Sequence, residues 1–206
     1  MSKYTLHYFG VNGRAAIARA VLSYAKADWT NDLIKNEDWP KIKTSGLCEY
    51  EQVPVLEVGG KKYCESNAIN LYLAETFDLL GKDVEENYQI NNLLMSADDY
   101  TKVARELYMC TDESKKPELK KKTEDKLKFL YTRYEKKYID FGKGKYFLGD
   151  KFTLGDIFLT VNLFYTLQSL GLPESGCKDV APNVTELAGR VKENELKEFF
   201  EKYFIK

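Results

Sequence analysis

The sequence is poor in the residues that most catalytic and metal sites use. Its 206 residues contain one histidine, His7, and four scattered cysteines without a C-x-x-C pair, which are Cys48, Cys64, Cys110 and Cys177. A serine or cysteine nucleophile activated by histidine is therefore hard to assemble, and neither a zinc site nor a disulfide framework is indicated. We expect reduced thiols.

An excess of charge of one sign is lacking too, as are long apolar runs. The 31 basic and 32 acidic residues leave a net charge of −1, so no overall field attracts nucleic acid or an anionic membrane. No run approaches the roughly 18 apolar residues that cross a bilayer, and the first ten residues contain no apolar signal-peptide core. We expect a cytoplasmic protein with no nucleic-acid or membrane partner.

Two kinds of pattern divide the chain, which at 44% hydrophobic residues can bury a substantial core. Strand-like and helical segments alternate in the first part, and only helical periodicity follows. In the first part we expect strands at 4–9 and 29–34, a helix at 14–25, an irregular stretch at 35–51, a hairpin around Gly59-Gly60, and a helix with Ser66 as its N-cap. In the second part we expect helices at 86–112, 117–138, 154–170 and 182–194 and another from 196, with a Thr153–Asp156 capping arrangement. The predicted domains are 1–79 and an all-helical 85–206, joined by a linker at 80–84.

Tyr8 ends the first alternating segment, in the stretch YTLHYFGVNGRA from Tyr4 to Ala15. Alternation places Tyr8 on one face with Leu6 and places His7 on the opposite face. On the strand alone, the simpler interpretation of Tyr8 is a core tyrosine whose hydroxyl reaches the surface.

Three further motifs suit a small zwitterionic peptide with two acid ends. Gln52–Pro54 (QVP) sets a proline at a strand entrance, where a free backbone edge can bind a peptide. At the start of a helix, Ser66 and the backbone N–H groups favour a carboxylate, while Glu65 can take an ammonium group. Trp39 and Lys43 in DWPKIK can bind a second carboxylate, although a buried anchor and a surface charge are the simpler interpretation of these two residues.

These motifs, together with SADDY and FTLGDIFL, resemble those of the cytosolic glutathione transferases, in the same order over essentially the whole chain. The resemblance implies a thioredoxin-like α/β N-terminal domain followed by an all-α domain. HYFGVNGRA and DWPKIK look most like the sigma class among the tyrosine-type enzymes. LCEYEQVP resembles the pi-class stretch in which a tyrosine at the place of Tyr50 enters the partner subunit, and Glu51 stands where a glycine is usual.

The resemblance implies glutathione as co-substrate, with Tyr8 donating a hydrogen bond to its sulfur. Arg14 would supply positive potential nearby, or would instead form an ion pair across a subunit interface. The residues implied to hold the tripeptide are Tyr8, Trp39, Lys43, Gln52, Val53 before a cis-Pro54, Glu65 and Ser66, with Asp99 approaching from the other subunit of a homodimer. The implied electrophile site comprises Phe9, Asn12, Gly13, Tyr100 and Tyr108.

The expected function is conjugation of glutathione to small electrophiles, a detoxification reaction. One alternative is a glutathione-dependent isomerase of the prostaglandin D synthase type, and another is a non-catalytic protein of the same fold. In such synthases an acid cluster near the subunit interface binds a divalent ion. Here Met95 replaces one acid beside Asp98 and Asp99, so no specific metal is expected.

Overall fold

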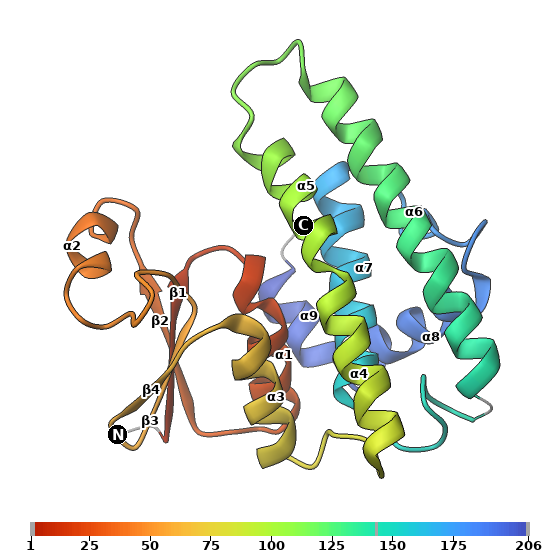
Figure 1. Cartoon of the computed structure of the whole chain (residues 1–206), viewed down its shortest axis with the longest axis horizontal. Coiled ribbons are helices and arrows are strands. Elements are labelled where there is room, and N and C mark those ends of the chain that lie inside the picture. The colour runs from red at the N-terminus through yellow and green to blue at the C-terminus, as the bar shows by residue number, and fades with distance from the viewer. Residues whose placement is uncertain (1–2, 143, 205–206) are drawn as a thin grey trace. The chain divides into compact units, whose positions relative to one another are not determined.

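The computed structural model describes residues 3–142 and 144–204, which fold into two compact units. The N-terminal unit contains the chain up to Leu80 together with the segment from Lys192 onward, and the helical unit spans Gly81–Val191. Figure 1 shows a small sheet with its helices in the first unit and helices alone in the second. The predicted fold class is confirmed.

The N-terminal unit is built on a four-stranded mixed sheet with the order β2-β1-β3-β4. Strand β1 (Tyr4–Phe9) runs parallel to β2 (Trp29–Ile34) and antiparallel to β3 (Val55–Val58), which pairs with β4 (Lys61–Tyr63). Burial alternates along β1 as expected, with Tyr4, Leu6 and Tyr8 inside. The hairpin turn at Gly59-Gly60 is also confirmed, since both glycines have the positive φ that such a turn requires.

Four helices complete this unit. The short 3₁₀ turn Gly13–Ala15 leads into α1 (Ala16–Tyr24), which contacts both α3 (Ser66–Thr76) and α9 (Lys197–Tyr203). The short helix α2 (Trp39–Lys43) lies in the stretch expected to be irregular, because Pro40 near its start supplies a helical φ. Ser66 is the first helical residue rather than the predicted N-cap, a position that Glu65 occupies.

The helical unit contains α4 (Val84–Ser96), α5 (Asp98–Met109), α6 (Lys116–Phe141), α7 (Leu154–Leu170) and α8 (Pro182–Glu193). The single helix expected over 86–112 is wrong. It divides at Ala97, which ends α4 and precedes α5, and this alanine offers no glycine or proline signal for a break. In the part of the chain that the structure describes, no helix is long and apolar enough to cross a membrane.

Helix α7 is the centre of the second core, and its start is capped from both sides, as the Thr153–Asp156 arrangement predicts. The hydroxyl oxygen of Thr153 accepts from the Gly155 N–H at 3.2 Å, and the Asp156 carboxylate accepts from the Thr153 N–H at 2.9 Å. The same carboxylate accepts from the Phe147 N–H at 2.8 Å. Burial outweighs these hydrogen bonds and raises the pKa of Asp156 to about 6.

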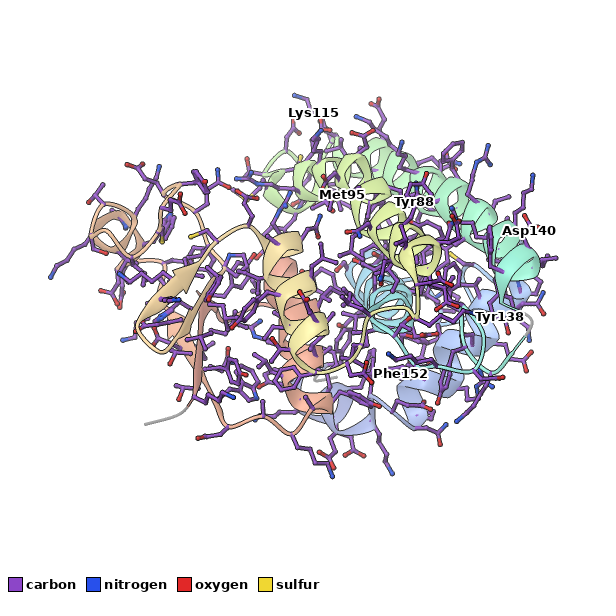
Figure 2. The ribbon with its side chains drawn as sticks, turned by 60° about the horizontal axis from the view of Figure 1, so that its bottom comes forward. Tyr88, Met95, Lys115, Tyr138, Asp140 and Phe152 are labelled. Carbon is purple, nitrogen blue, oxygen red and sulfur yellow. The ribbon has the colours of Figure 1, made fainter. Side chains whose placement is uncertain are left out.

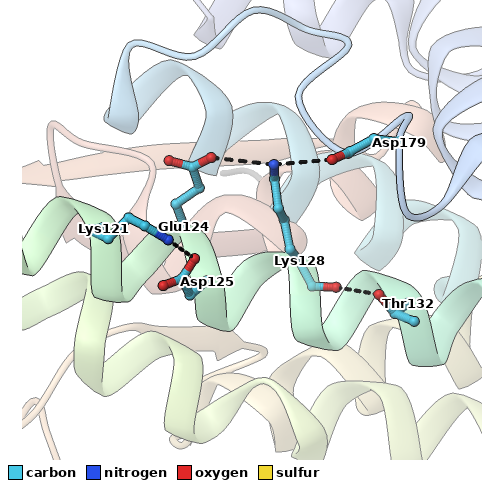
Figure 3. A network of polar contacts seen from close by, with 6 residues as sticks. All are labelled: Lys121, Glu124, Asp125, Lys128, Thr132 and Asp179. Carbon is cyan, nitrogen blue, oxygen red and sulfur yellow. Dashed lines mark hydrogen bonds and ion pairs between the residues drawn. The ribbon is translucent and has the colours of Figure 1, made fainter.

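A lysine-rich run at 115–128 lies mostly in helix α6, and several of its charges pair with neighbouring acids. Lys121 pairs with Asp125, and the Lys128 ammonium lies 3.4 Å from Glu124 and 3.2 Å from Asp179, which follows α7 (Figure 3). Such pairing is typical of a solvated helix face rather than of a binding patch.

Candidate functional site

Tyr8 lies at the end of β1, and the following turn closes around its hydroxyl. The Arg14 backbone N–H donates to the Tyr8 hydroxyl oxygen at 3.1 Å. Gly13 has a φ of 40°, and a Cβ atom at that position would lie 2.7 Å from the same oxygen. Only glycine therefore allows the turn to approach so closely. Because the oxygen accepts from the turn, its own O–H hydrogen points elsewhere and can be donated to a bound acceptor.

Beside this turn, the N-terminal unit has a small pocket made mostly of predicted residues. The lining contains one cation, one carboxylate and the cis peptide bond at Val53-Pro54. The lining residues are Arg14, Tyr50, Gln52, Val53, Pro54, Cys64, Glu65 and Ser66. Six of these were expected at or near a peptide site, whereas Cys64 was not singled out. Arg14 and Glu65 give the pocket opposite charges, which suit the amino and carboxylate groups of an amino acid.

Glu65, in the lining of this pocket, has an unusual backbone conformation. Its φ of 66° and ψ of 111° are rare for a residue with a side chain, and it directly precedes the first turn of α3. Strained positions of this kind cluster at binding and catalytic sites. The first N–H groups of an eleven-residue helix also begin here, next to the buried Ser66.

Trp39 and Lys43 lie on α2 and do not line the pocket. The Trp39 ring meets the Phe9 ring edge-to-face at 5.4 Å, and Phe9 meets Tyr8 in the same way at 5.4 Å. The Lys43 ammonium lies 3.5 Å from a carboxylate oxygen of Glu51. Glu51, which stands where a glycine is usual, has a φ of 52°, in the left-handed region that favours glycine.

The residues expected at the electrophile site belong to both units. Phe9, Asn12 and Gly13 lie at the Tyr8 turn, and the Asn12 side-chain amide donates to the Tyr203 carbonyl at 2.9 Å. In the helical unit, Tyr108 is 72% exposed. Tyr100 is buried instead, and its hydroxyl donates to Thr166 at 2.6 Å, because its face of α5 turns into the helical core.

Asp99 stands in the first turn of α5 and pairs with Lys102 at 3.3 Å. The neighbouring Asp98 lies on the same helix. Within residues 3–142 and 144–204, no group of three or more histidine, cysteine, aspartate or glutamate side chains is arranged to hold a metal ion.

Arg19 is the residue of this region that the sequence patterns missed. It is 2% exposed within α1, and its guanidinium lies 5.6 Å from the centre of the Tyr8 ring. Burial lowers its pKa. The available signal was a charged residue in the middle of the apolar stretch AIARAVL, since arginine is rarely fully buried without a specific set of acceptors.

The sequence matches known protein families in both parts of the chain. Residues 4–75 match the family described as "Glutathione S-transferase, N-terminal domain", and residues 97–203 match "Glutathione S-transferase, C-terminal domain". The chain is 30% identical to human glutathione S-transferase A1 over 161 residues, which are 78% of this chain and 72% of that protein. It is 38% identical over 109 residues to a probable glutathione S-transferase 7 of Caenorhabditis elegans, covering 53% of this chain and 52% of that protein.

Solved structures of similar proteins cover nearly the whole chain. A prostaglandin synthase D of Nilaparvata lugens superposes with a TM-score of 0.83 at 27% identity, over 99% of this chain and 100% of that one. A sigma-class transferase of Fasciola hepatica gives 0.83 at 26% identity, over 98% and 97%. A transferase of Necator americanus described as monomeric gives 0.84 at 25% identity, over 96% of each chain.

A thioredoxin-like sheet, a helical unit and a pocket with opposite charges near the turn after Tyr8 define the class. The chain belongs to the glutathione S-transferase family. Two of the curated relatives from Caenorhabditis elegans align with this chain over only about half of their length, 52% and 51%.

Proposed function

We propose that this protein is a sigma-like glutathione transferase that binds glutathione in the N-terminal pocket and adds its thiolate to small electrophiles. The single observation that carries the proposal is the pocket itself, where Arg14 and Glu65 present opposite charges beside the backbone of Val53 and the start of α3. This arrangement suits the α-amino acid end of the γ-glutamyl group. Trp39, Lys43 and Gln52 would then hold the rest of the tripeptide.

Tyr8 supplies the chemical step in this proposal. A free thiol has a pKa of about 8.5 and is only a few per cent ionised at neutral pH. A hydrogen bond to an anion contributes about 1.5–3 kcal/mol, enough to increase the ratio of thiolate to thiol at least tenfold. Tyr8 acts as a donor and not as a base, so the single histidine is no obstacle. Its oxygen already accepts from Arg14, which leaves the O–H for the sulfur.

The proposed protein is a cytoplasmic homodimer, and the exposed surface of α4 supports the pairing of two copies. Along one side of α4, Val84, Tyr88 and Met95 are 86%, 57% and 48% exposed, an apolar stripe at helical spacing that a second copy could cover. Figure 2 labels Tyr88 and Met95 on this helix. Tyr50, in the N-terminal unit, is 57% exposed and is available to enter a partner, and Asp99 would reach the γ-glutamyl amine of that partner's glutathione.

The decisive experiment combines binding and turnover in wild type and Tyr8→Phe. Retention on immobilised glutathione, with conjugation of a chlorinated dinitrobenzene that falls about tenfold or more in the variant, supports the transferase. Tyr138→Phe is the matched control, since it removes a hydroxyl from α6 that makes no hydrogen bond to residues 3–142 and 144–204. Failure of the wild type to bind glutathione at millimolar concentration contradicts the proposal and favours the non-catalytic alternative.

The likeness to a prostaglandin synthase D supports a second candidate, a glutathione-dependent isomerase that uses the same Tyr8. The two reactions differ in what happens to glutathione. An isomerase returns the tripeptide unchanged, whereas conjugation consumes one glutathione for each product. Measuring free thiol during turnover of a prostaglandin endoperoxide and of the dinitrobenzene separates the two.

A further inference from the structure

A buried guanidinium holds the turn that carries the Tyr8 hydrogen bond. Arg19 Nη2 donates to the Phe9 carbonyl at 2.9 Å, and Nη1 donates to the Val11 carbonyl at 2.5 Å. These two carbonyls stand on either side of Gly10, where β1 ends and the turn begins. The third donor, Nε, reaches the Asn31 side chain on β2 at 3.1 Å. The planar fork of one arginine thus fixes both sides of the strand-to-turn junction.

The charge of this guanidinium is balanced by dipoles and ring faces. Its recorded hydrogen bonds go to two carbonyls and one amide oxygen, and it lies 5.6 Å from the centre of the Tyr8 ring and 5.9 Å from that of Tyr203. Burying a cation without a carboxylate is costly in free energy. Its three hydrogen bonds go to Asn31 on β2 and to the two carbonyls of the junction after Tyr8. The free-energy cost of burying the cation is therefore offset by a fixed geometry of that junction.

The segment near the end of the chain holds the same turn from a second side. The Asn12 side-chain amide donates to the Tyr203 carbonyl at 2.9 Å, at the last residue of α9. The Tyr203 ring is itself held, with its centre 5.4 Å from that of Phe199 and 6.4 Å from that of Trp29. Helix α9 packs on α1, which also carries Arg19. The turn is therefore clamped between α1 and α9.

Small movements of this turn reach the reacting group directly. The Arg14 N–H is 3.1 Å from the Tyr8 oxygen, and Gly13 approaches the same atom so closely that even a methyl group would collide with it. A displacement of the turn changes which direction the Tyr8 O–H takes. Misplacing a reacting group by about 1 Å can reduce a rate by about a hundredfold.

We propose that Arg19 is a positioning residue for Tyr8 and that Asn12 with Tyr203 completes the clamp, so that helix α9 takes part in aiming the catalytic hydroxyl. This inference rests on the proposed function, because it concerns the same tyrosine. Phe9, Val11 and Asn31, which accept the hydrogen bonds of Arg19, do not line the pocket. Arg14 lines the pocket and belongs to the same turn, but the atoms that the clamp holds lie outside the pocket, so we expect a larger effect on turnover than on the affinity for glutathione.

The kinetic test uses Arg19→Lys and Asn12→Ala. Lysine keeps the positive charge but cannot span both carbonyls with a fork, so we expect kcat to fall about tenfold or more while KM for glutathione changes less than about twofold. Asn12→Ala is expected to lower kcat about threefold or more. In both variants the midpoint of the rate against pH moves to higher pH. Glu201→Gln, on the exposed side of α9, is the control and keeps wild-type kinetics.

A second readout needs no glutathione. Hydrogen exchange of the Arg14 amide, followed by NMR, reports its bond to Tyr8 in the free protein, and we expect faster exchange in both variants than in the wild type or Glu201→Gln. If the wild type does not bind glutathione, the proposed function fails. The exchange measurement still tests whether Arg19 and Asn12 hold the turn that bonds to Tyr8.

The proposal is overturned if the folded variants keep wild-type kcat, pH profile and Arg14 amide protection. Circular dichroism and melting curves establish whether each variant is folded. Should Arg19→Lys not fold, Asn12→Ala decides alone, because it removes one hydrogen bond from a half-buried side chain.

Discussion

Glu51 places a carboxylate beside the cation that the proposed binding mode assigns to the glycyl end of glutathione. Its side chain lies 3.5 Å from the Lys43 ammonium, and the two side chains are 58% and 45% exposed. The incoming carboxylate must therefore displace Glu51 from Lys43 or share the ammonium with it. Glu51→Gln removes this competition while keeping the size of the side chain, so we expect tighter binding of glutathione.

The magnitude follows from the geometry of the pair. Opposite unit charges at this separation attract by about 1.2 kcal/mol in bulk water, and exposed pairs are worth about 0.2–1 kcal/mol in measurements. Releasing Lys43 should therefore favour the ligand by about 0.4–1 kcal/mol, a two- to fivefold lower Kd. Glu51→Gly should give the same change in Kd. Glu51→Gly also changes the stability of the fold. It removes the free-energy penalty of about 1–2 kcal/mol for a side chain in the left-handed region, and the flexibility of glycine in the unfolded chain offsets part of this gain.

Isothermal titration calorimetry with glutathione measures this effect directly. The gain in affinity should shrink as salt is raised, because the competing charges are exposed. Glu201→Gln breaks a comparable exposed pair with Lys197 on α9 and should leave Kd unchanged. Equal or weaker binding by Glu51→Gln at low salt would refute the reasoning, and would mean that Lys43 does not meet a ligand carboxylate or needs Glu51 to position it.

Three further outcomes are expected. Gly13→Ala brings a methyl group within 2.7 Å of the Tyr8 oxygen, so conjugation should fall more than about tenfold while the helical unit keeps its melting behaviour; unchanged turnover contradicts the close approach. Burial raises the pKa of Asp156 to about 6 in the native state, so the native state holds this proton more tightly than the unfolded chain. The free energy of unfolding in urea, taken as wild type minus Asp156→Asn, should therefore decrease as pH rises from about 4 to 6. A difference that does not change with pH refutes this. Met95→Glu puts a charge in the exposed stripe of α4 and should convert the proposed dimer to the 23.8 kDa monomer in light scattering; a stable dimer would exclude this face.

The local elements were predictable where short-range rules decide them. Alternation over Tyr4–Phe9, the glycine pair of the hairpin and the capping arrangement before Leu154 each depend on residues close in sequence, and each is present. The break at Ala97 was not predictable in this way. Alanine is a good helix former, so only packing of the two helices against the rest of their unit ends α4 there.

The candidate site likewise contains residues that local motifs predict and contacts that only the folded chain forms. Gln52, Val53 and Pro54 and the pair Glu65-Ser66 could be proposed from their motifs, and they do line one pocket. The pairing of Lys43 with Glu51 could not, because it depends on how α2 and the following loop fold back over eight residues. The strained backbone of Glu65 is equally invisible in the sequence, since nothing local demands a positive φ at a glutamate.

By itself, the sequence determined the order of strands and helices, because periodicity, capping and turn chemistry are local properties. Its motifs also carried the family resemblance, and that resemblance implied the role of Tyr8. Only the tertiary structure decided what surrounds that tyrosine. The burial of Arg19 and the contact between Asn12 and Tyr203 join positions up to 191 residues apart. Such contacts form only when α1 and α9 pack together, so the means of aiming Tyr8 is a property of the folded chain.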